Sequence, residues 1–133
     1  LDDTWQAVAV AGLAAVQDFN SRNATYAPAL ANATLAGCDK QLLVSVLDSG
    51  STGRVSLQQL IDSATKTNAS ECGVSAHAIV GPARSAASVP TASVTGALDI
   101  PQISYWSSST VLDDTATFPR FMRTFPTDEV SGE

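Results

Sequence analysis

Serine hydroxyls follow two apolar segments of this chain, in a pattern typical of a site that binds a small molecule. The sequence IVGPARS occupies residues 79–85, and IPQISYWSSS occupies residues 100–109. Each segment has the pattern of a strand that ends in a turn rich in Gly or Ser. In an open parallel sheet, the loops after adjacent strands meet at one crevice, where such sheets bind ligands. We therefore expect Ser85 and Ser108 to lie in the mouth of a binding site.

The order of the predicted elements indicates an α/β fold. Pro90 should kink a helix interior, so the helix predicted over 85–98 is expected to begin near Ser88. Alternating helices and strands favour a parallel sheet flanked by helices, with right-handed crossovers. The apolar spacing predicts helices over 5–19, 55–64 and 85–98, strands over 41–47, 76–80, 101–105 and 122–125, and a last helix opening at Asp128.

Composition limits the class of protein. The 133 residues make one domain or part of one, and 44% of them are hydrophobic, which argues against long disorder. The net charge of −6 argues against a nucleic-acid partner. No apolar run approaches the length of a membrane span, so the fragment itself should be soluble. Its first residues, LDD, are not those of a signal peptide, and we expect a processed product or an excised piece.

Three N-glycosylation acceptors point to an extracellular or lumenal protein. They begin at Asn23, Asn32 and Asn68, and all lie in polar stretches between the periodic segments. Cys38 and Cys72 are the only cysteines, an even number that fits one disulfide. Two buried free thiols fit the count almost as well, so the bridge stays one of two alternatives.

The chain has no pattern that indicates an enzyme or a metal site. His77 is the only histidine, and no cysteine or acidic residue accompanies it at ligand spacing. The sequence contains no nucleophile elbow, P-loop or dinucleotide fingerprint. We therefore expect no catalysis, no cofactor and no bound metal, and a non-covalent binding function instead.

Beyond these patterns, several motifs resemble one known family. They are FN at 19–20, the turn after Asp48, GP at 81–82, IPQISY at 100–105, SYWSSS at 104–109, FPRFMRT at 118–124 and PTD at 126–128. The chain is similar over nearly its whole length to the receptor family ligand-binding region. This family has the type 1 periplasmic-binding-protein fold of metabotropic GABA and glutamate receptors, natriuretic-peptide receptors and bacterial branched-chain amino-acid-binding proteins.

The resemblance implies a fold and a function. Residues 1–133 would be the N-terminal lobe, Rossmann-like and incomplete, of the extracellular ligand-binding domain of a membrane receptor. An amino acid or related carboxylate would bind between this lobe and a second lobe, and closure of the cleft would be the signal. Ser85 matches the residue that holds the carboxylate, and Ser108 matches a second polar contact. Tyr105, Trp106 and Ser107 adjoin Ser108 in the same predicted site. Homo- or heterodimers would also be expected.

Less specific interpretations stand beside each of these assignments. Ser85 fits a helix cap, the serines at 107–109 fit an ordinary turn, and Trp106 fits packing rather than recognition. Asp48 fits a turn-forming residue, and Arg123 fits a structural ion-pair partner of Asp113 or Asp114. Two other functions stay open for the whole chain. One is a dimerisation or structural module with a degenerate pocket, and the other is a solute-binding subunit of an amino-acid transporter.

Overall fold

The chain divides into two units that are described separately. The computed structural model describes residues 3–32, 37, 39–65 and 76–131. Unit 1 is Leu1–Val46 and unit 2 is Leu47–Glu133. The predicted disulfide and the third acceptor site lie outside the described residues, at Cys38, Cys72 and Asn68. Among the residues described, no helix is both long and apolar enough to cross a bilayer.

Unit 1 is built on the helix α1, Asp3–Ser21, followed by the 3-10 turn η1, Pro28–Ala31. The residues after α1 hold a later segment of the same unit. The side-chain amide of Asn20 donates from Nδ2 to the carbonyl of Leu42 at 2.9 Å, and its Oδ1 accepts from the Leu42 N–H at 2.7 Å. Arg22 donates to the carbonyl of Lys40 at 2.8 Å. Two side chains thereby supply backbone partners that a neighbouring strand would otherwise supply.

The predicted strand over residues 41–47 is not formed, which is a correction. These residues belong to no helix or strand, and their apolar side chains are exposed, with Leu43 at 72% and Val46 at 59%. A strand covered on both faces needs hydrogen-bonded strands beside it. Among the described residues, no strand pairs with this segment, so the apolar run lacks the partners its pattern requires.

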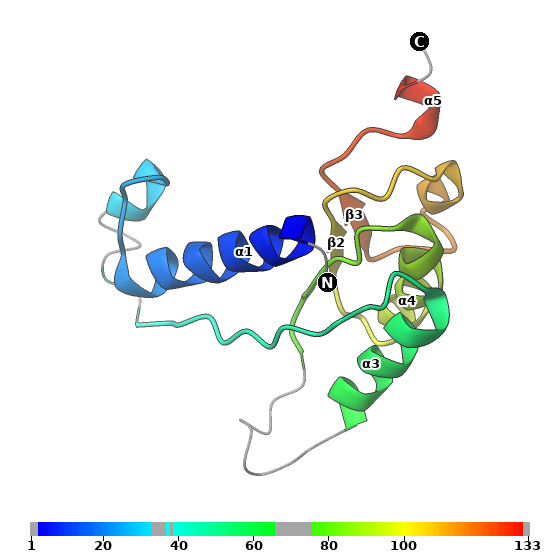
Figure 1. Ribbon diagram of the computed structural model, residues 1–133, viewed down its shortest axis with the longest axis horizontal. Helices are drawn as coiled ribbons and strands as arrows, with labels where there is room; N and C mark the ends of the chain where they lie inside the picture. Colours follow the sequence, from blue (N-terminus) through cyan, green and yellow to red (C-terminus); the bar gives the residue numbers. More distant parts are fainter. Residues whose placement is uncertain (1–2, 33–36, 38, 66–75, 132–133) are drawn as a thin grey trace. The chain divides into compact units, whose positions relative to one another are not determined.

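Unit 2 contains the parallel sheet that the sequence predicts. Its three strands lie in the order β1-β2-β3, and both pairs are parallel (Figure 1). The α/β class and the open parallel sheet with helices are therefore confirmed. The elements are α3 (Gly53–Thr65), β1 (Ile79–Val80), α4 (Ser85–Ala97), β2 (Gln102–Ser104), η2 (Thr110–Asp113), β3 (Phe121–Arg123) and α5 (Asp128–Ser131).

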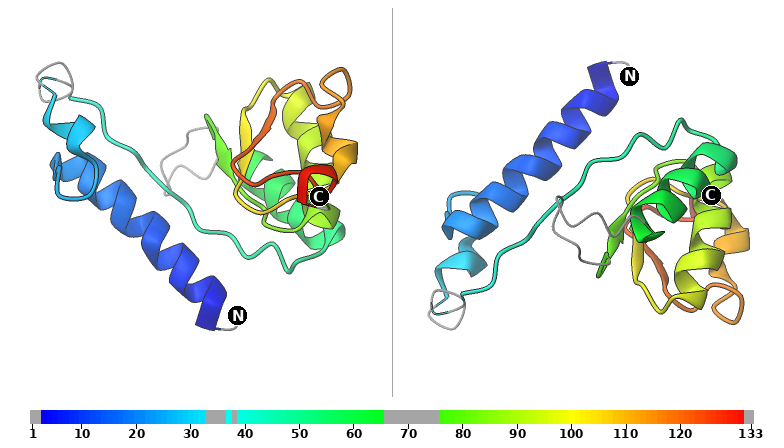
Figure 2. Two further views of the ribbon diagram at one scale, coloured as in Figure 1. Left: turned by 90° about the horizontal axis from the view of Figure 1, so that it is seen from above. Right: turned by 90° about the horizontal axis from the view of Figure 1, so that it is seen from below.

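The helix α4 begins at Ser85 and contains Pro90, so the predicted start near Ser88 is wrong. A proline has no N–H to donate to the carbonyl four residues earlier, here that of Ala86. The neighbouring helix α3 packs at this point, and Figure 2 shows α3 and α4 side by side. A Cβ built on Gly53 would lie 2.8 Å from the Ala86 oxygen and 3.0 Å from Pro90 Cγ. Glycine at the start of α3 allows this close approach.

The core of unit 2 lies between α4 and the residues that lead into β3. Ala92, Leu112 and Phe118 form a buried apolar cluster, with Val89 and Phe121 packed against it. Full burial of a side chain such as Leu or Phe stabilises a fold by roughly 1.5–3 kcal/mol. The 3-10 turn η2 therefore contributes to stability through Leu112, which is 4% exposed.

A buried polar contact joins β2 to α4 beside this core. Gln102 is fully buried; its Nε2 donates to Thr91 Oγ1 at 3.1 Å, and its Oε1 accepts from Thr95 Oγ1 at 3.1 Å. Residues in register on parallel strands share a face, and Ser104 is in register with Arg123. Gln102, Ser104 and Arg123 therefore project from the same face of the sheet, toward α4 and the loop after β2.

Candidate functional site

The hydroxyl of Ser85 connects the two predicted turns. Ser85 is the first residue of α4, and its Oγ accepts hydrogen bonds from the backbone N–H groups of Ser108 at 3.2 Å and Ser109 at 3.1 Å. The N-cap of α4 is Arg84, and its side chain makes no capping bond. The structure thus brings Ser85 and Ser108 together, as the sequence predicts, and Ser85 links two loops rather than capping its own helix.

Ser107 lies beneath this contact and is fully buried. Its Oγ is 2.7 Å from Ser88 Oγ, 2.9 Å from Ser104 Oγ and 3.1 Å from the carbonyl oxygen of Ala83. Ser104 is also fully buried and donates to the carbonyl of Pro82 at 2.7 Å. These hydroxyls hold the turn after β1 against the turn after β2. The pattern of small hydroxyl residues in both turns is the sequence signal for them, but it does not separate buried serines from accessible ones.

Tyr105 and Trp106 follow β2 and lie in different surroundings. Tyr105 is partly buried, and this burial raises the pKa of its phenol above the ordinary value. Its ring lies near the end of β1, because a Cβ built on Gly81 would be 3.7 Å from Tyr105 Cε1. Trp106 is 52% exposed and stacks on Phe125, with ring centroids 5.8 Å apart. The indole is therefore packed against the segment that follows β3.

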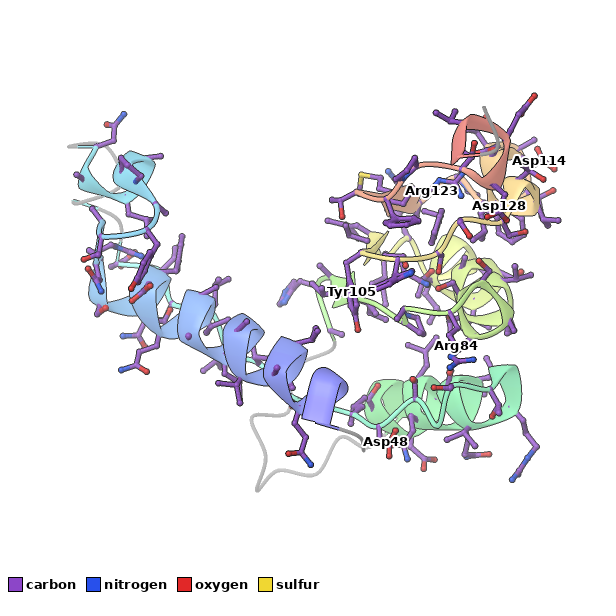
Figure 3. All side chains as sticks on the ribbon, turned by 45° about the horizontal axis from the view of Figure 1, so that its top comes forward. Asp48, Arg84, Tyr105, Asp114, Arg123 and Asp128 are labelled. Carbon is purple, nitrogen blue, oxygen red and sulfur yellow. The ribbon has the colours of Figure 1, made fainter. Side chains whose placement is uncertain are left out.

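Two donors bind the backbone carbonyl groups of residues 107–109, which follow β2 and are called the serine loop below. Arg123 on β3, which Figure 3 labels, donates from Nη1 to the carbonyl of Ser107 at 3.3 Å and to that of Ser109 at 2.9 Å. The backbone N–H of Asp128 donates to the carbonyl of Ser108 at 2.8 Å. The Nη2 atom of Arg123 pairs with Asp113, which confirms one of the two predicted ion pairs. No sequence pattern predicts the contacts with the carbonyl groups.

Asp114 has a separate structural role. Its carboxylate accepts from the hydroxyl and the N–H of Thr117 and from the N–H of Ala116. These bonds hold the pKa of the Asp114 carboxyl below its ordinary value, with the Thr117 hydroxyl as the largest cause. Asp48 also forms a local turn, because its Oδ1 accepts from the Gly50 N–H at 2.8 Å. This contact agrees with the turn-forming interpretation of Asp48.

Arg84 and His77 are the remaining residues with a candidate charged or metal-binding role. Arg84 is exposed immediately before Ser85, and α4 has no acidic residue in its first turn. His77 is exposed and precedes β1 by two residues, so it lies in a bend rather than on a strand as expected. Over the described ranges, no three His, Cys, Asp or Glu side chains gather in a way that could hold a metal ion.

Comparison with known proteins finds similarity to receptors. The chain is 45% identical over 65 residues to the G-protein coupled receptor family C group 6 member A of Carassius auratus. It is 44% identical over 62 residues to the extracellular calcium-sensing receptors of Homo sapiens and Mus musculus. The matches cover 49% and 47% of this chain, but only 7% and 6% of those receptors. All three relatives are named as receptors.

A family comparison covers much more of the chain. Residues 8–133 match the model of the receptor family ligand binding region. This range contains α1 of unit 1 from its sixth residue on, and every described element of unit 2. It also contains both turns that meet at Ser85. The chain therefore belongs to the receptor family ligand-binding region.

Proposed function

We propose that this chain is the N-terminal lobe of the extracellular ligand-binding domain of a membrane receptor, and that it binds the carboxylate of a small amino acid or related molecule. One observation carries the proposal. The backbone N–H groups of Ser108 and Ser109 converge on the hydroxyl of Ser85. An oxygen that accepts two hydrogen bonds is a stronger donor of its own proton, and adjacent N–H groups aimed at one point favour a negatively charged oxygen.

The surrounding charges favour the same ligand class. Ser85 opens a helix of 13 residues, whose N-terminus carries a partial positive charge. No acidic side chain in the first turn of α4 neutralises it, and Arg84 adds a full positive charge beside it. A carboxylate bound by Ser85 and the loop after β2 would gain charge-assisted hydrogen bonds, which are stronger than neutral ones.

The other predicted site residues take different roles in this proposal. Ser107 fixes the loop rather than touching the ligand, because its hydroxyl is buried and has partners in both turns. Tyr105 and Trp106 lie beside Ser108 in the chain and offer aromatic surface to the non-polar part of a ligand. The Trp106 indole would do so from its place on Phe125.

The receptor context of the proposal rests on the family and on its relatives. Two of the similar proteins are named as receptors of G-protein coupled or calcium-sensing type, and the chain spans a small part of each. In the proposed receptor, a second lobe outside residues 1–133 closes over the ligand, and the closed state is favoured by contacts made only when both lobes hold it. Asn23, Asn32 and Asn68 would carry glycans on the extracellular face.

Calorimetric titration of the secreted two-lobed ectodomain tests the proposal. The probes are the twenty common L-amino acids and GABA, added to wild type, Ser85→Ala, Ser108→Ala and Ser93→Ala. Ser93 is the matched control, since it is an exposed serine of α4 that bonds only within its helix, to the carbonyl of Val89 at 3.2 Å. We expect at least one probe to bind wild type, and the first two variants to weaken it by about tenfold or more.

The titration, combined with sedimentation and with the sequence of the full polypeptide, separates the two other functions. An absence of heat with every probe, or an affinity unchanged in both site variants, would overturn carboxylate binding. A protein that binds no probe but associates with itself in sedimentation would be a dimerisation module with a degenerate pocket. A solute-binding subunit would bind probes without any membrane-spanning segment in the same polypeptide.

A further inference from the structure

In the serine loop, two successive peptide units each have a carbonyl bound by a donor and an N–H group directed at Ser85. In a planar trans peptide, the C=O and N–H groups point in opposite directions. The unit between Ser107 and Ser108 has its carbonyl on Arg123 Nη1 at 3.3 Å and its N–H on Ser85 Oγ at 3.2 Å. A donor bound to the carbonyl therefore fixes the direction of the N–H.

The next peptide unit repeats this arrangement. Its carbonyl, on Ser108, accepts from the Asp128 N–H at 2.8 Å, and its N–H, on Ser109, donates to Ser85 Oγ at 3.1 Å. The carbonyl of Ser109 then accepts from the same Arg123 Nη1 atom at 2.9 Å. Arg123 thus binds the first and third carbonyls of the loop, and the Asp128 N–H binds the second.

The guanidinium of Arg123 is itself held in place. It projects from β3 in register with Ser104, and only 11% of its side chain is exposed. The carboxylate of Asp113 pairs with Nη2 and leaves Nη1 directed at the loop. An arginine fork is planar and rigid, whereas a lysine ammonium is a compact point charge that cannot reproduce both directions.

We propose that Arg123 is a positioning residue for anion recognition. It orients the N–H group of Ser108 toward Ser85 by binding the carbonyl of Ser107, and its charge there polarises this peptide so that the N–H donates more strongly to Ser85 Oγ, whose own proton then binds a carboxylate.

The N–H of Ser109 is oriented by the Asp128 N–H, and Arg123 holds the loop beyond it through the carbonyl of Ser109. Asp113 sets the orientation of the guanidinium. This inference rests on the proposed function, because it assigns Arg123 to the same anion site, without contact between Arg123 and the ligand.

Hydrogen–deuterium exchange of the ligand-free ectodomain, resolved to single amides by mass spectrometry, tests the orientation. The variants are Arg123→Lys and Asp113→Asn, with Arg120→Gln as the matched control. Arg120 precedes the same strand but pairs with Asp99, and both side chains are largely exposed. We expect the amide of Ser108 to exchange about tenfold faster in Arg123→Lys, less so in Asp113→Asn, and at the wild-type rate in Arg120→Gln.

The β2 amide of Gln102 separates positioning from general destabilisation. Its N–H donates to the carbonyl of Arg120 and reports on the sheet rather than on the loop. Wild-type rates for the Ser108 amide in Arg123→Lys and Asp113→Asn would overturn the inference. Acceleration that is equal at Gln102, or equal in Arg120→Gln, would overturn it as well, because it would show a merely structural role.

A second measurement keeps the inference separate from the proposed function. The exchange experiment is repeated with an equimolar mixture of the twenty common L-amino acids and GABA. In wild type we expect the mixture to slow exchange at the Ser108 amide, and in Arg123→Lys we expect about one tenth of that protection. No effect of the mixture on wild type would overturn the proposed function. Equal protection in wild type and Arg123→Lys would overturn the role of Arg123 alone.

Discussion

The side-chain amide of Gln102 on β2 accepts a hydrogen bond from the hydroxyl of Thr95 on α4, with 3.1 Å between Oε1 and Oγ1 and no exposed surface on either residue. The sheet and its covering helix are therefore joined by a polar contact as well as by apolar packing. A buried amide of this kind is tolerated because its hydrogen-bonding atoms have partners, and it penalises any other register of α4 on the sheet.

Removing one partner of this contact should destabilise unit 2. Thr95→Val keeps the shape of the side chain but leaves the Gln102 oxygen without its donor, so we expect a loss of about 1–3 kcal/mol in the free energy of unfolding. Ser93→Ala in the same helix is the control, because its hydroxyl is exposed and bonds to the carbonyl of Val89. Denaturant unfolding measures both. Equal effects of the two substitutions would contradict the importance of the buried amide.

A methyl group at Gly53 should disturb the packing of α3 on α4. The new Cβ would lie 2.8 Å from the carbonyl oxygen of Ala86, and backbone cannot move aside cheaply. We expect Gly53→Ala to lower the free energy of unfolding by about 1–3 kcal/mol. Gly12→Ala in α1 has no atom within 4 Å of its Cβ and should gain about 0.5–1 kcal/mol from helix propensity. Thermal unfolding of both variants measures these effects. We expect the free energy of unfolding to fall in Gly53→Ala and to rise in Gly12→Ala.

Acidification should remove stability through Asp114. The folded-state pKa of this carboxyl lies below its reference value of 3.8, so its stabilising contribution is complete above pH 3.8 and is lost as the pH falls through the lower folded-state pKa. Thr117→Val removes the largest cause of the shift. We expect the unfolding free energy of this variant to depend less on pH below about pH 4 than that of wild type. Parallel curves for the two proteins would show that Thr117 does not set this pKa.

Asn23 should carry a glycan when the protein passes through a secretory pathway. Its side chain is exposed, and the Thr25 hydroxyl donates to Asn23 Oδ1 at 2.7 Å. We expect Asn23→Gln and Thr25→Ala each to remove one glycan mass, as measured on the intact protein before and after enzymatic deglycosylation. Asn20→Gln is the control, because Asn20 is not part of an acceptor motif. A glycan retained in Thr25→Ala would rule out modification at this position.

Local patterns in the sequence predict the elements and the turns of unit 2. Two apolar strands that end in Gly and Ser imply parallel strands with loops at one edge, and the structure brings Ser85 and Ser108 together there. An ion pair of Arg123 with Asp113 or Asp114 is also predicted, and the structure selects Asp113. These predictions succeed because strand period, turn residues and charge pairing are short-range properties.

Other predictions fail where distant residues decide. The apolar run at 41–47 has a strand pattern, but a strand exists only when another strand accepts its hydrogen bonds, and the described residues supply the Asn20 side chain instead. The early start of α4 depends on α3, since Gly53 packs where Pro90 withholds an N–H. Local propensity contains no information about either neighbour.

The sequence alone therefore determined the α/β class, the two serine turns and the family resemblance of this protein. The tertiary structure decided which serine hydroxyl is buried in the loop contact and which one accepts the backbone N–H groups. Ser107 is buried against Ser88, whereas Ser85 receives two N–H groups, although both are serines in similar turns. The Ser108 N–H is directed by Arg123 of β3, which binds the Ser107 carbonyl, and the Ser109 N–H by the backbone of Asp128 of α5, which binds the Ser108 carbonyl. The physical reason is that a peptide has one plane, and its orientation depends on both of its ends.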